Sequence, residues 1–340
     1  MLELRYPPAH RLDDQHFAAV RNVIAEVSEA QQRLGYRAGN QLIIDKIGLD
    51  AQFAQDEGYW REALDYHLGL LYAHVGEPEK AAYHFERSDT HPSTGGNQVF
   101  SDHQRESLEL RRHQDRARER GIPSLTIAAM PRSASASLTQ TIASLLDAPL
   151  MRVSCGSFPR FNLVPRWLNS FSPGGAVLHD HFGATAFNLK TLREGRVPVV
   201  FVRARDPRAA AASAVNLSNR IHGEPDDIDR ESQIIQYCEQ SFIPWVADWI
   251  AASDTATGVK IHWLAQPSNA ISDMVRQILT TLLPEYPVLA QYLGADVDEV
   301  RANFVAGDND AWRLVVSAAG QERLWHALPQ NVKDFLRLKP

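Results

Sequence analysis

From about residue 121 onward, short apolar runs alternate with amphipathic or alanine-rich segments, and a loop joins each pair. The apolar runs cover residues 124–130, 175–182, 197–204 and 258–264. Runs of this length between loops are typical of buried strands, and strands that alternate with helices form a parallel sheet. The sequence therefore predicts an α/β domain, a parallel sheet with flanking helices, over residues 121–340.

The first 120 residues instead show helical spacing. Apolar side chains recur every three or four residues over 17–34 and again over 41–55, and a charged helix is predicted over 101–119. Between them, residues 63–92 predict a pair of helices joined by a turn. The expected organisation is an all-α segment over residues 1–120, followed by the α/β domain.

The predicted helix pair resembles one tetratricopeptide unit. The positions that carry the resemblance are Leu68, Gly69, Tyr72, Gly76, Ala81 and Phe85. No second copy follows at a spacing of about 34 residues, and stable arrays need about three. The hairpin is interpreted as a helical scaffold or dimer surface, with a peptide-binding groove as the alternative. We therefore expect these helices to recruit a protein partner or to mediate self-association.

Net charge and cysteine content limit which classes of ligand and which cellular compartment we expect for this chain. The chain has 35 Lys and Arg against 41 Asp and Glu, a net charge of -6. A duplex-DNA binder is usually basic, so we expect no nucleic-acid partner and a local cluster for any anionic ligand. Only Cys155 and Cys238 are present, and neither a signal peptide nor a membrane span is recognisable. We expect a soluble, cytoplasmic protein.

The loop after the first predicted strand has the features of a phosphate site. It carries Arg132 and three hydroxyls, those of Ser133, Ser135 and Ser137, and a helix is predicted to start near Ser137. Backbone N–H groups at such a helix start bind anions. The Walker A and G-x-G-x-x-G patterns are both missing, which argues against an ATPase, a GTPase or a nucleotide kinase. The alternative is an ordinary capped helix.

A second group of polar residues follows the third predicted strand. Arg205 lies at its end and Ser213 eight residues later, on a helix that Pro207 can begin. Ligands of open parallel sheets bind beyond the carboxyl ends of the strands, so both are expected to face the loop at Arg132. Arg203 is expected to add to this positive patch, and Arg208 to lie on the helix surface.

The two segments together resemble a known family. A P-R-S-A-S-A-S loop followed some 70 residues later by R-D-P-R-x-x-x-x-S is similar to the sulfotransferases that use 3′-phosphoadenosine 5′-phosphosulfate (PAPS). The resemblance implies a P-loop-like sulfotransferase fold, with Arg205 and Ser213 on the 3′-phosphate. It also implies that the 5′-phosphosulfate is held by Arg132, Ser133, Ala134, Ser135, Ala136 and Ser137.

The resemblance also implies a catalytic base. In V-L-H-D-H-F-G, His181 matches the family's base and His179 matches its lysine, while Arg132 would stabilise the transferring sulfuryl group. In-line transfer of this kind needs no metal. Two alternatives remain: the histidines share one strand face and could bind zinc, or His181 is structural. Asp180 is expected on the opposite face.

Some positions depart from the family pattern. Ala134 replaces the usual Gly, and a φ above zero there would cost about 1 kcal/mol, while Ala136 replaces a Thr. The R-K-G segment that helps to hold the 3′-phosphate has only a trace, supplying Gly307, Trp312 and Arg313. Trp263 is predicted to stack on the adenine, with a core role as the alternative.

The sequence thus predicts a PAPS-dependent sulfotransferase that acts on an acceptor hydroxyl and releases 3′-phosphoadenosine 5′-phosphate (PAP). The alternative is a non-catalytic binding or scaffold protein on a decayed sulfotransferase fold, whose N-terminal helices recruit a partner. The acceptor class stays open among a phenol, a sugar, a lipid alcohol and a peptidyl tyrosine. Residues 158–171 and 224–231 are candidate lid or acceptor-loop segments.

Overall fold

The computed structural model describes residues 41–42, 65, 68–73, 75–87, 103–156, 158–222, 229–255, 257–264, 270–295 and 310–339. By packing, the chain divides into two compact units. One contains residues 1–110 with 152–170, and the other contains 111–151 with 171–340. The helix predicted over 17–34 lies outside the described residues, as does the one over 41–55 apart from residues 41–42, which are helical.

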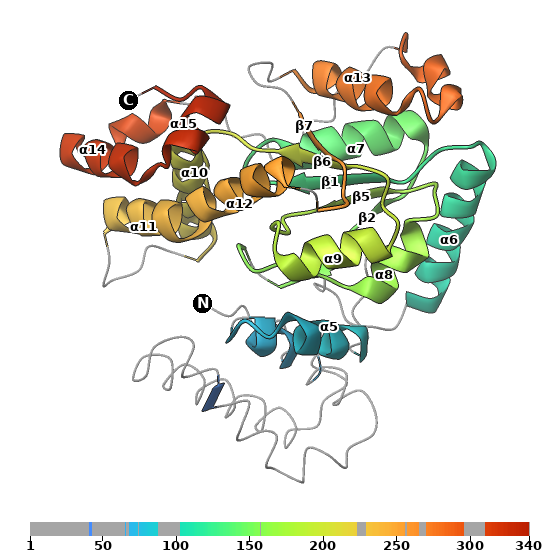
Figure 1. Ribbon diagram of the computed structural model, residues 1–340, viewed down its shortest axis with the longest axis horizontal. Coiled ribbons are helices and arrows are strands. Elements are labelled where there is room, and N and C mark those ends of the chain that lie inside the picture. Colours follow the sequence, from blue (N-terminus) through green and yellow to red (C-terminus); the bar gives the residue numbers. More distant parts are fainter. Residues whose placement is uncertain are drawn as a thin grey trace. The chain divides into compact units, whose positions relative to one another are not determined.

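The larger unit is built on a five-stranded parallel sheet with the order β2-β5-β1-β6-β7 (Figure 1). Its strands are β1 Leu125–Ala129, β2 Leu150–Met151, β5 Val177–Asp180, β6 Val200–Arg203 and β7 Ile261–Trp263. All four predicted apolar runs contain a strand, which confirms the predicted parallel α/β class. The two-residue strand β2 was not predicted.

The helices of the α/β region are α6 His103–Glu119, α7 Ser135–Leu146, α9 Ala186–Glu194, α10 Pro207–His222, α11 Arg230–Tyr237, α12 Ile243–Asp254, α13 Ile271–Leu282, α14 Ala318–Ala327 and α15 Gln330–Leu336. A π-helical turn, Cys238–Phe242, joins α11 to α12, and 3-10 turns cover Pro287–Tyr292 and Ala311–Leu314. In Figure 1, α7 and α13 lie over one face of the sheet and α9 over the other.

The core explains why the strands read as continuous apolar runs. Every residue of β1 is buried, because helices cover both faces of the sheet. The apolar positions of α13 recur every three or four residues and join those of α7 against the sheet, in one cluster with Leu125 and Ile127. No helix among the described residues combines the length and apolarity needed to cross a bilayer.

The strand order fixes where a ligand can bind. The chain passes from β5 to β6 across β1, which lies between them. In open parallel sheets, ligands bind beyond the carboxyl ends of the strands where the strand order switches direction in this way. In this sheet that position is the edge where Ala129, Asp180 and Arg203 end their strands.

The smaller unit includes α5 Pro78–Arg87, the antiparallel pair β3 Ser154–Cys155 and β4 Asn162–Leu163, and most of α8 Pro165–Phe171. Helical residues lie on both sides of a turn at Gly76, whose φ is 86°. A Cβ placed on Gly69 would lie 2.5 Å from the ring of Phe85, so the close approach requires glycine.

This geometry agrees with a helical hairpin, and its likeness to a tetratricopeptide unit stays a prediction. The candidate acceptor-loop segment 158–171 contains β4 and α8 in place of an open loop. Residues 224–228 of the other candidate segment lie outside the described residues, and Asp229 caps α11.

Candidate anion-binding site at the carboxyl edge of the sheet

The loop between β1 and α7 has an unusual backbone. Ala134 has φ 64° and Arg132 has φ 65°, both in the left-handed region. The sequence predicted this conformation at Ala134 but not at Arg132. A non-glycine residue in this region is strained by about 1–2 kcal/mol, and such strain collects at binding loops. Helix α7 begins at Ser135, two residues before the predicted start.

The amino end of α7 presents backbone donors without a side-chain cap. Ala134 is the N-cap residue and supplies no side-chain acceptor for the first-turn N–H groups. Such a helix end carries a partial positive charge and suits an anion. Ser135 and Ser137 are buried in this first turn, with Ala136 between them half-buried.

The three serine hydroxyls do not play equal parts. Ser133 Oγ donates to the carbonyl of Met130 over 2.6 Å, so its single proton is already used. A ligand at this position can therefore donate to Ser133 but cannot receive its proton. The Ser133 hydroxyl is therefore not the ligand donor that the sequence predicted.

The predicted phosphate-clamp residues come together. Arg132 Nε donates to Ser213 Oγ over 3.0 Å, although the two residues are 81 positions apart in the chain. Arg205 Nη1 donates to the carbonyl of Arg132 over 3.1 Å. Loop, strand end and helix α10 therefore meet at one place, as the sequence predicted.

Arg203 holds the loop between β1 and α7 through two hydrogen bonds. Its carbonyl accepts from Met130 N over 2.8 Å, and its Nε donates to the carbonyl of Ser133 over 3.3 Å. The side chain is only 2% exposed. Burial, and then the like charge of Arg205, lower the pKa of the Arg203 guanidinium to about 10, so it is still cationic at neutral pH.

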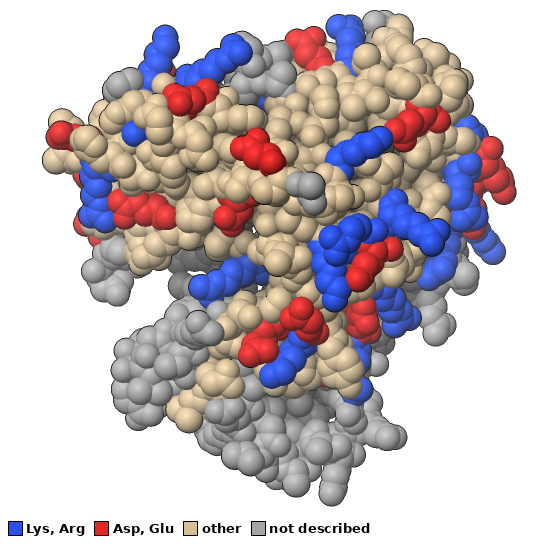
Figure 2. Space-filling view, in the orientation of Figure 1, with Lys and Arg blue, Asp and Glu red and all other residues tan. Residues whose placement is uncertain are grey.

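The pKa values of the two neighbouring arginines, Arg132 and Arg205, are lowered as well. Burial, and then Arg220, lower the pKa of Arg132. Burial also lowers the pKa of Arg205, the Asp206 carboxylate opposes that shift, and Arg132 adds to it. The surface seen in Figure 2 interleaves acidic and basic side chains on a chain of net charge -6. The positive potential is therefore local, and a bound anion would offset the repulsion between these cations.

His181 follows β5 at the same edge. Its Nδ1 lies 2.6 Å from the carbonyl oxygen of Ala129. A carbonyl can only accept, so Nδ1 carries the proton and the lone pair of the neutral ring is on Nε2. Asp180 Oδ1 accepts from the backbone N–H of His181 over 3.0 Å, so this carboxylate holds the main chain of His181. The His179 ring packs edge-on at a centroid distance of 5.3 Å.

Two tryptophans that the sequence analysis did not single out also hold this segment. Trp245 Nε1 donates to the carbonyls of His181 and Phe182, at 3.1 and 3.2 Å. Trp249 Nε1 donates to Phe182 O over 3.3 Å. Both indoles are buried on α12, one helical turn apart. The W-x-x-x-W spacing in an apolar helix was the available signal, since buried indoles need hydrogen-bond acceptors.

Other predicted site residues have different surroundings. Trp263 is half-buried, packs against Phe335 at a centroid distance of 4.6 Å and donates to Ser253 Oγ. Trp312 is buried, and Arg313 pairs with Asp310 over 3.1 Å. Gly307 lies outside the described residues. In the part of the chain that the structure describes, no three His, Cys, Asp or Glu side chains gather as a metal site requires.

The prediction that Arg208 lies on the helix surface is wrong. The residue is 2% exposed and pairs with Asp206 Oδ2 over 2.8 Å. Its guanidinium lies over the rings of Trp312 and Trp325. Burial of an arginine requires such compensation, and the two rings come from distant parts of the sequence.

Comparison with known proteins gave limited similarity. No family model and no curated protein matches the chain. Among solved structures, the chain is similar to mouse sulfotransferase SULT7A1 complexed with PAP, at 12% sequence identity and a TM-score of 0.40. That similarity covers 68% of this chain and 92% of the mouse chain.

Proposed function

We propose that the protein is a PAPS-dependent sulfotransferase that moves a sulfuryl group to an acceptor hydroxyl. The observation that carries the proposal is the meeting of Arg132, Arg205 and Ser213 beside the uncapped amino end of α7. Two half-buried cations, a hydroxyl and a helix amino end at one sheet edge suit a ligand with two separate anionic groups.

The donor would be held at both of its charged ends. Arg205 and Ser213 are the proposed partners of the 3′-phosphate. The loop from Arg132 to Ser137 is the proposed partner of the 5′-phosphosulfate, with backbone N–H groups as its main donors. This binding mode is supported by the left-handed backbone at Arg132 and Ala134, which shapes the loop before α7. Trp263 is the proposed stacking partner of the adenine.

The transfer step needs a base at the acceptor oxygen. As that oxygen forms its bond to sulfur, the bond between sulfur and the 5′-phosphate oxygen breaks and PAP leaves. The hydroxyl proton passes to His181 Nε2, a role supported by the Nδ1 contact to Ala129 O, which selects the required tautomer. Arg132 stabilises the charge that develops on the leaving phosphate. The residues named act without a metal ion.

The test is a binding comparison between PAP and 5′-AMP, which lacks the 3′-phosphate. Replacing Arg205 and Ser213 together by Ala is expected to raise the Kd for PAP by about 100-fold, because charge-assisted hydrogen bonds are lost. The Kd for 5′-AMP should change by less than about threefold. Equal losses for both nucleotides would contradict the assignment.

A matched control removes the same side chains elsewhere. Arg193 and Ser218 are exposed on α9 and α10. The double replacement Arg193→Ala with Ser218→Ala should leave both dissociation constants unchanged. A loss in this control would mean that the first result reflects general damage to the fold.

A further inference from the structure

The residues that follow Arg205 form a tight ion pair. Arg208 Nε lies 3.0 and 3.2 Å from the two carboxylate oxygens of Asp206, and Arg208 Nη2 lies 2.8 Å from Oδ2. The same carboxylate accepts from the backbone N–H of Arg208 over 2.9 Å, at the start of α10. Asp206 thus caps the helix and is engaged by a two-pronged guanidinium.

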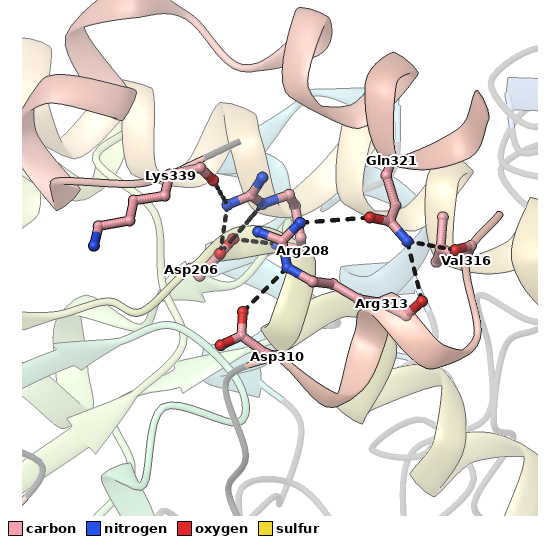
Figure 3. A network of polar contacts seen from close by, with 7 residues as sticks. All are labelled: Asp206, Arg208, Asp310, Arg313, Val316, Gln321 and Lys339. Atoms are coloured by element: carbon pink, nitrogen blue, oxygen red, sulfur yellow. Dashed lines mark hydrogen bonds and ion pairs between the residues drawn. The ribbon is translucent and has the colours of Figure 1, made fainter. Parts of the chain in front are cut away.

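The C-terminal elements hold Arg208 in this position (Figure 3). Its Nη2 also donates to the carbonyl of Lys339 over 2.8 Å. The guanidinium carbon lies 4.7 Å from the ring centre of Trp312 and 5.5 Å from that of Trp325. A planar cation fixed by a carbonyl and two rings has little freedom to leave the carboxylate.

The pair matters because Asp206 is next to Arg205 in the chain. The negative charge of Asp206 already attracts Arg205, as its opposing effect on the Arg205 pKa indicates. A carboxylate free to pair with Arg205 would compete with any anionic ligand for the same guanidinium.

We propose that Arg208 is a positioning residue that occupies the Asp206 carboxylate and so keeps this carboxylate from competing with the 3′-phosphate for Arg205. The inference rests on the proposed function. It assigns a role to the buried C-terminal contacts of Arg208, which have no direct part in the transfer step. Loss of Arg208 would leave Asp206 with its backbone hydrogen bond from residue 208 and an uncompensated charge beside Arg205.

The experiment compares the affinities of PAP and 5′-AMP by calorimetry in three variants. Arg208→Met is expected to weaken the binding of PAP about tenfold and that of 5′-AMP hardly at all, since the freed carboxylate competes only with the 3′-phosphate. Adding Asp206→Asn removes the competing charge but keeps the helix cap. The double variant should therefore recover the wild-type Kd for PAP to within about threefold.

Lys333→Met is the matched control. Lys333 Nζ lies over the Trp325 ring that Arg208 also contacts, at 4.5 Å from its centre. Its loss should leave the ratio of the two affinities unchanged. An unchanged ratio in Arg208→Met, a double variant that fails to recover, or an equal drop in Lys333→Met would each overturn the inference.

A second variant keeps the inference testable if Arg208→Met does not fold. Arg208→Lys keeps the charge but loses the two-pronged pairing, and it is expected to weaken PAP binding about threefold. Adding Asp206→Asn should remove that loss, and no loss with Lys would overturn the inference.

If the wild-type protein does not prefer PAP over 5′-AMP, the proposed function and this inference both fail. A wild-type preference with no effect of Arg208 removes the inference alone.

Discussion

At the scale of single residues, the loop before α7 holds two non-glycine residues in a backbone conformation that favours glycine. Ala134 and Arg132 both have φ near 65°. The side chain of Arg132 reaches Ser213, whereas Ala134 is exposed and offers only a methyl group. The strain at Ala134 is therefore a cost that the loop shape requires but that the alanine side chain does not offset.

Replacing Ala134 by Gly is expected to stabilise the protein. The left-handed backbone is strained for Ala and relaxed for Gly, so the free energy of unfolding should rise by about 1 kcal/mol. Chemical denaturation measures the change. Ala136→Gly is the control, because Ala136 lies within α7, where Gly should lower stability by about 0.5 kcal/mol. A loss of stability in both variants would contradict the account of the loop.

The meeting of Arg132, Arg205 and Ser213 was predictable from sequence, and the burial of Arg208 was not. Arg132, Arg205 and Ser213 follow strands whose carboxyl ends meet at one edge, so strand prediction alone brings them close. Arg208 pairs with its near neighbour Asp206, but its burial depends on Lys339, which is 131 positions away. Nothing in the local pattern of an alanine-rich helix indicates that a distant segment covers it.

At the scale of elements, α12 fixes the segment that follows β5. Its two indoles donate to the carbonyls of His181 and Phe182, while Nδ1 of His181 is held by the end of β1. The candidate base is thus held through its main chain by one element and through its ring by another. Contacts from two separate elements therefore restrict how the His181 ring can turn.

Trp245→Phe is expected to loosen His181. The carbonyl of His181 loses its indole donor, and leaving this part-buried carbonyl unsatisfied should cost about 1 kcal/mol of stability. Nitrogen NMR of the histidine rings should show the Nδ1-protonated form of His181 in the wild type and a mixture of both tautomers in the variant. His181→Asn identifies the signal.

Trp249→Phe is the matched variant for this test. Trp249 donates only to Phe182, so the tautomer of His181 should stay as in the wild type. A wild-type spectrum in Trp245→Phe would mean that α12 does not position the His181 ring.

The elements themselves were largely predictable where they are apolar and long enough. The four apolar runs became β1, β5, β6 and β7, because strands buried on both faces need continuous apolar side chains. Strand β2 has two residues, Leu150 and Met151, too few for any periodicity to appear. The start of α7 was placed two residues late, because helix boundaries depend on cap geometry that sequence shows poorly.

At the scale of the whole molecule, each of the two compact units is made of two separate stretches of the sequence. Residues 152–170 group with residues 1–110 and not with the sheet that they interrupt. Helix α5 packs on β4, and Arg166 N donates to Glu86 Oε1 over 3.0 Å. The predicted boundary near residue 120 would place this segment with the sheet.

Deleting residues 1–110 is expected to expose the 152–170 segment. Without α5, its local opening should become easier, and protease cleavage within it should be at least about tenfold faster than in the full chain. Limited proteolysis with mass spectrometry measures this, and cleavage near residue 196 in the sheet unit serves as an internal control. An unchanged rate in the segment would favour the boundary near residue 120.

The central claim is that this sheet edge recognises a 3′-phosphate. Calorimetric titration of the full-length protein with PAP, with 5′-AMP and ADP as controls, tests it most directly. The account predicts that PAP binds about 100-fold more tightly than 5′-AMP, because Arg205 and Ser213 contact only the 3′-phosphate. Equal affinity for PAP and 5′-AMP would contradict it and would direct attention to partners of the N-terminal helices.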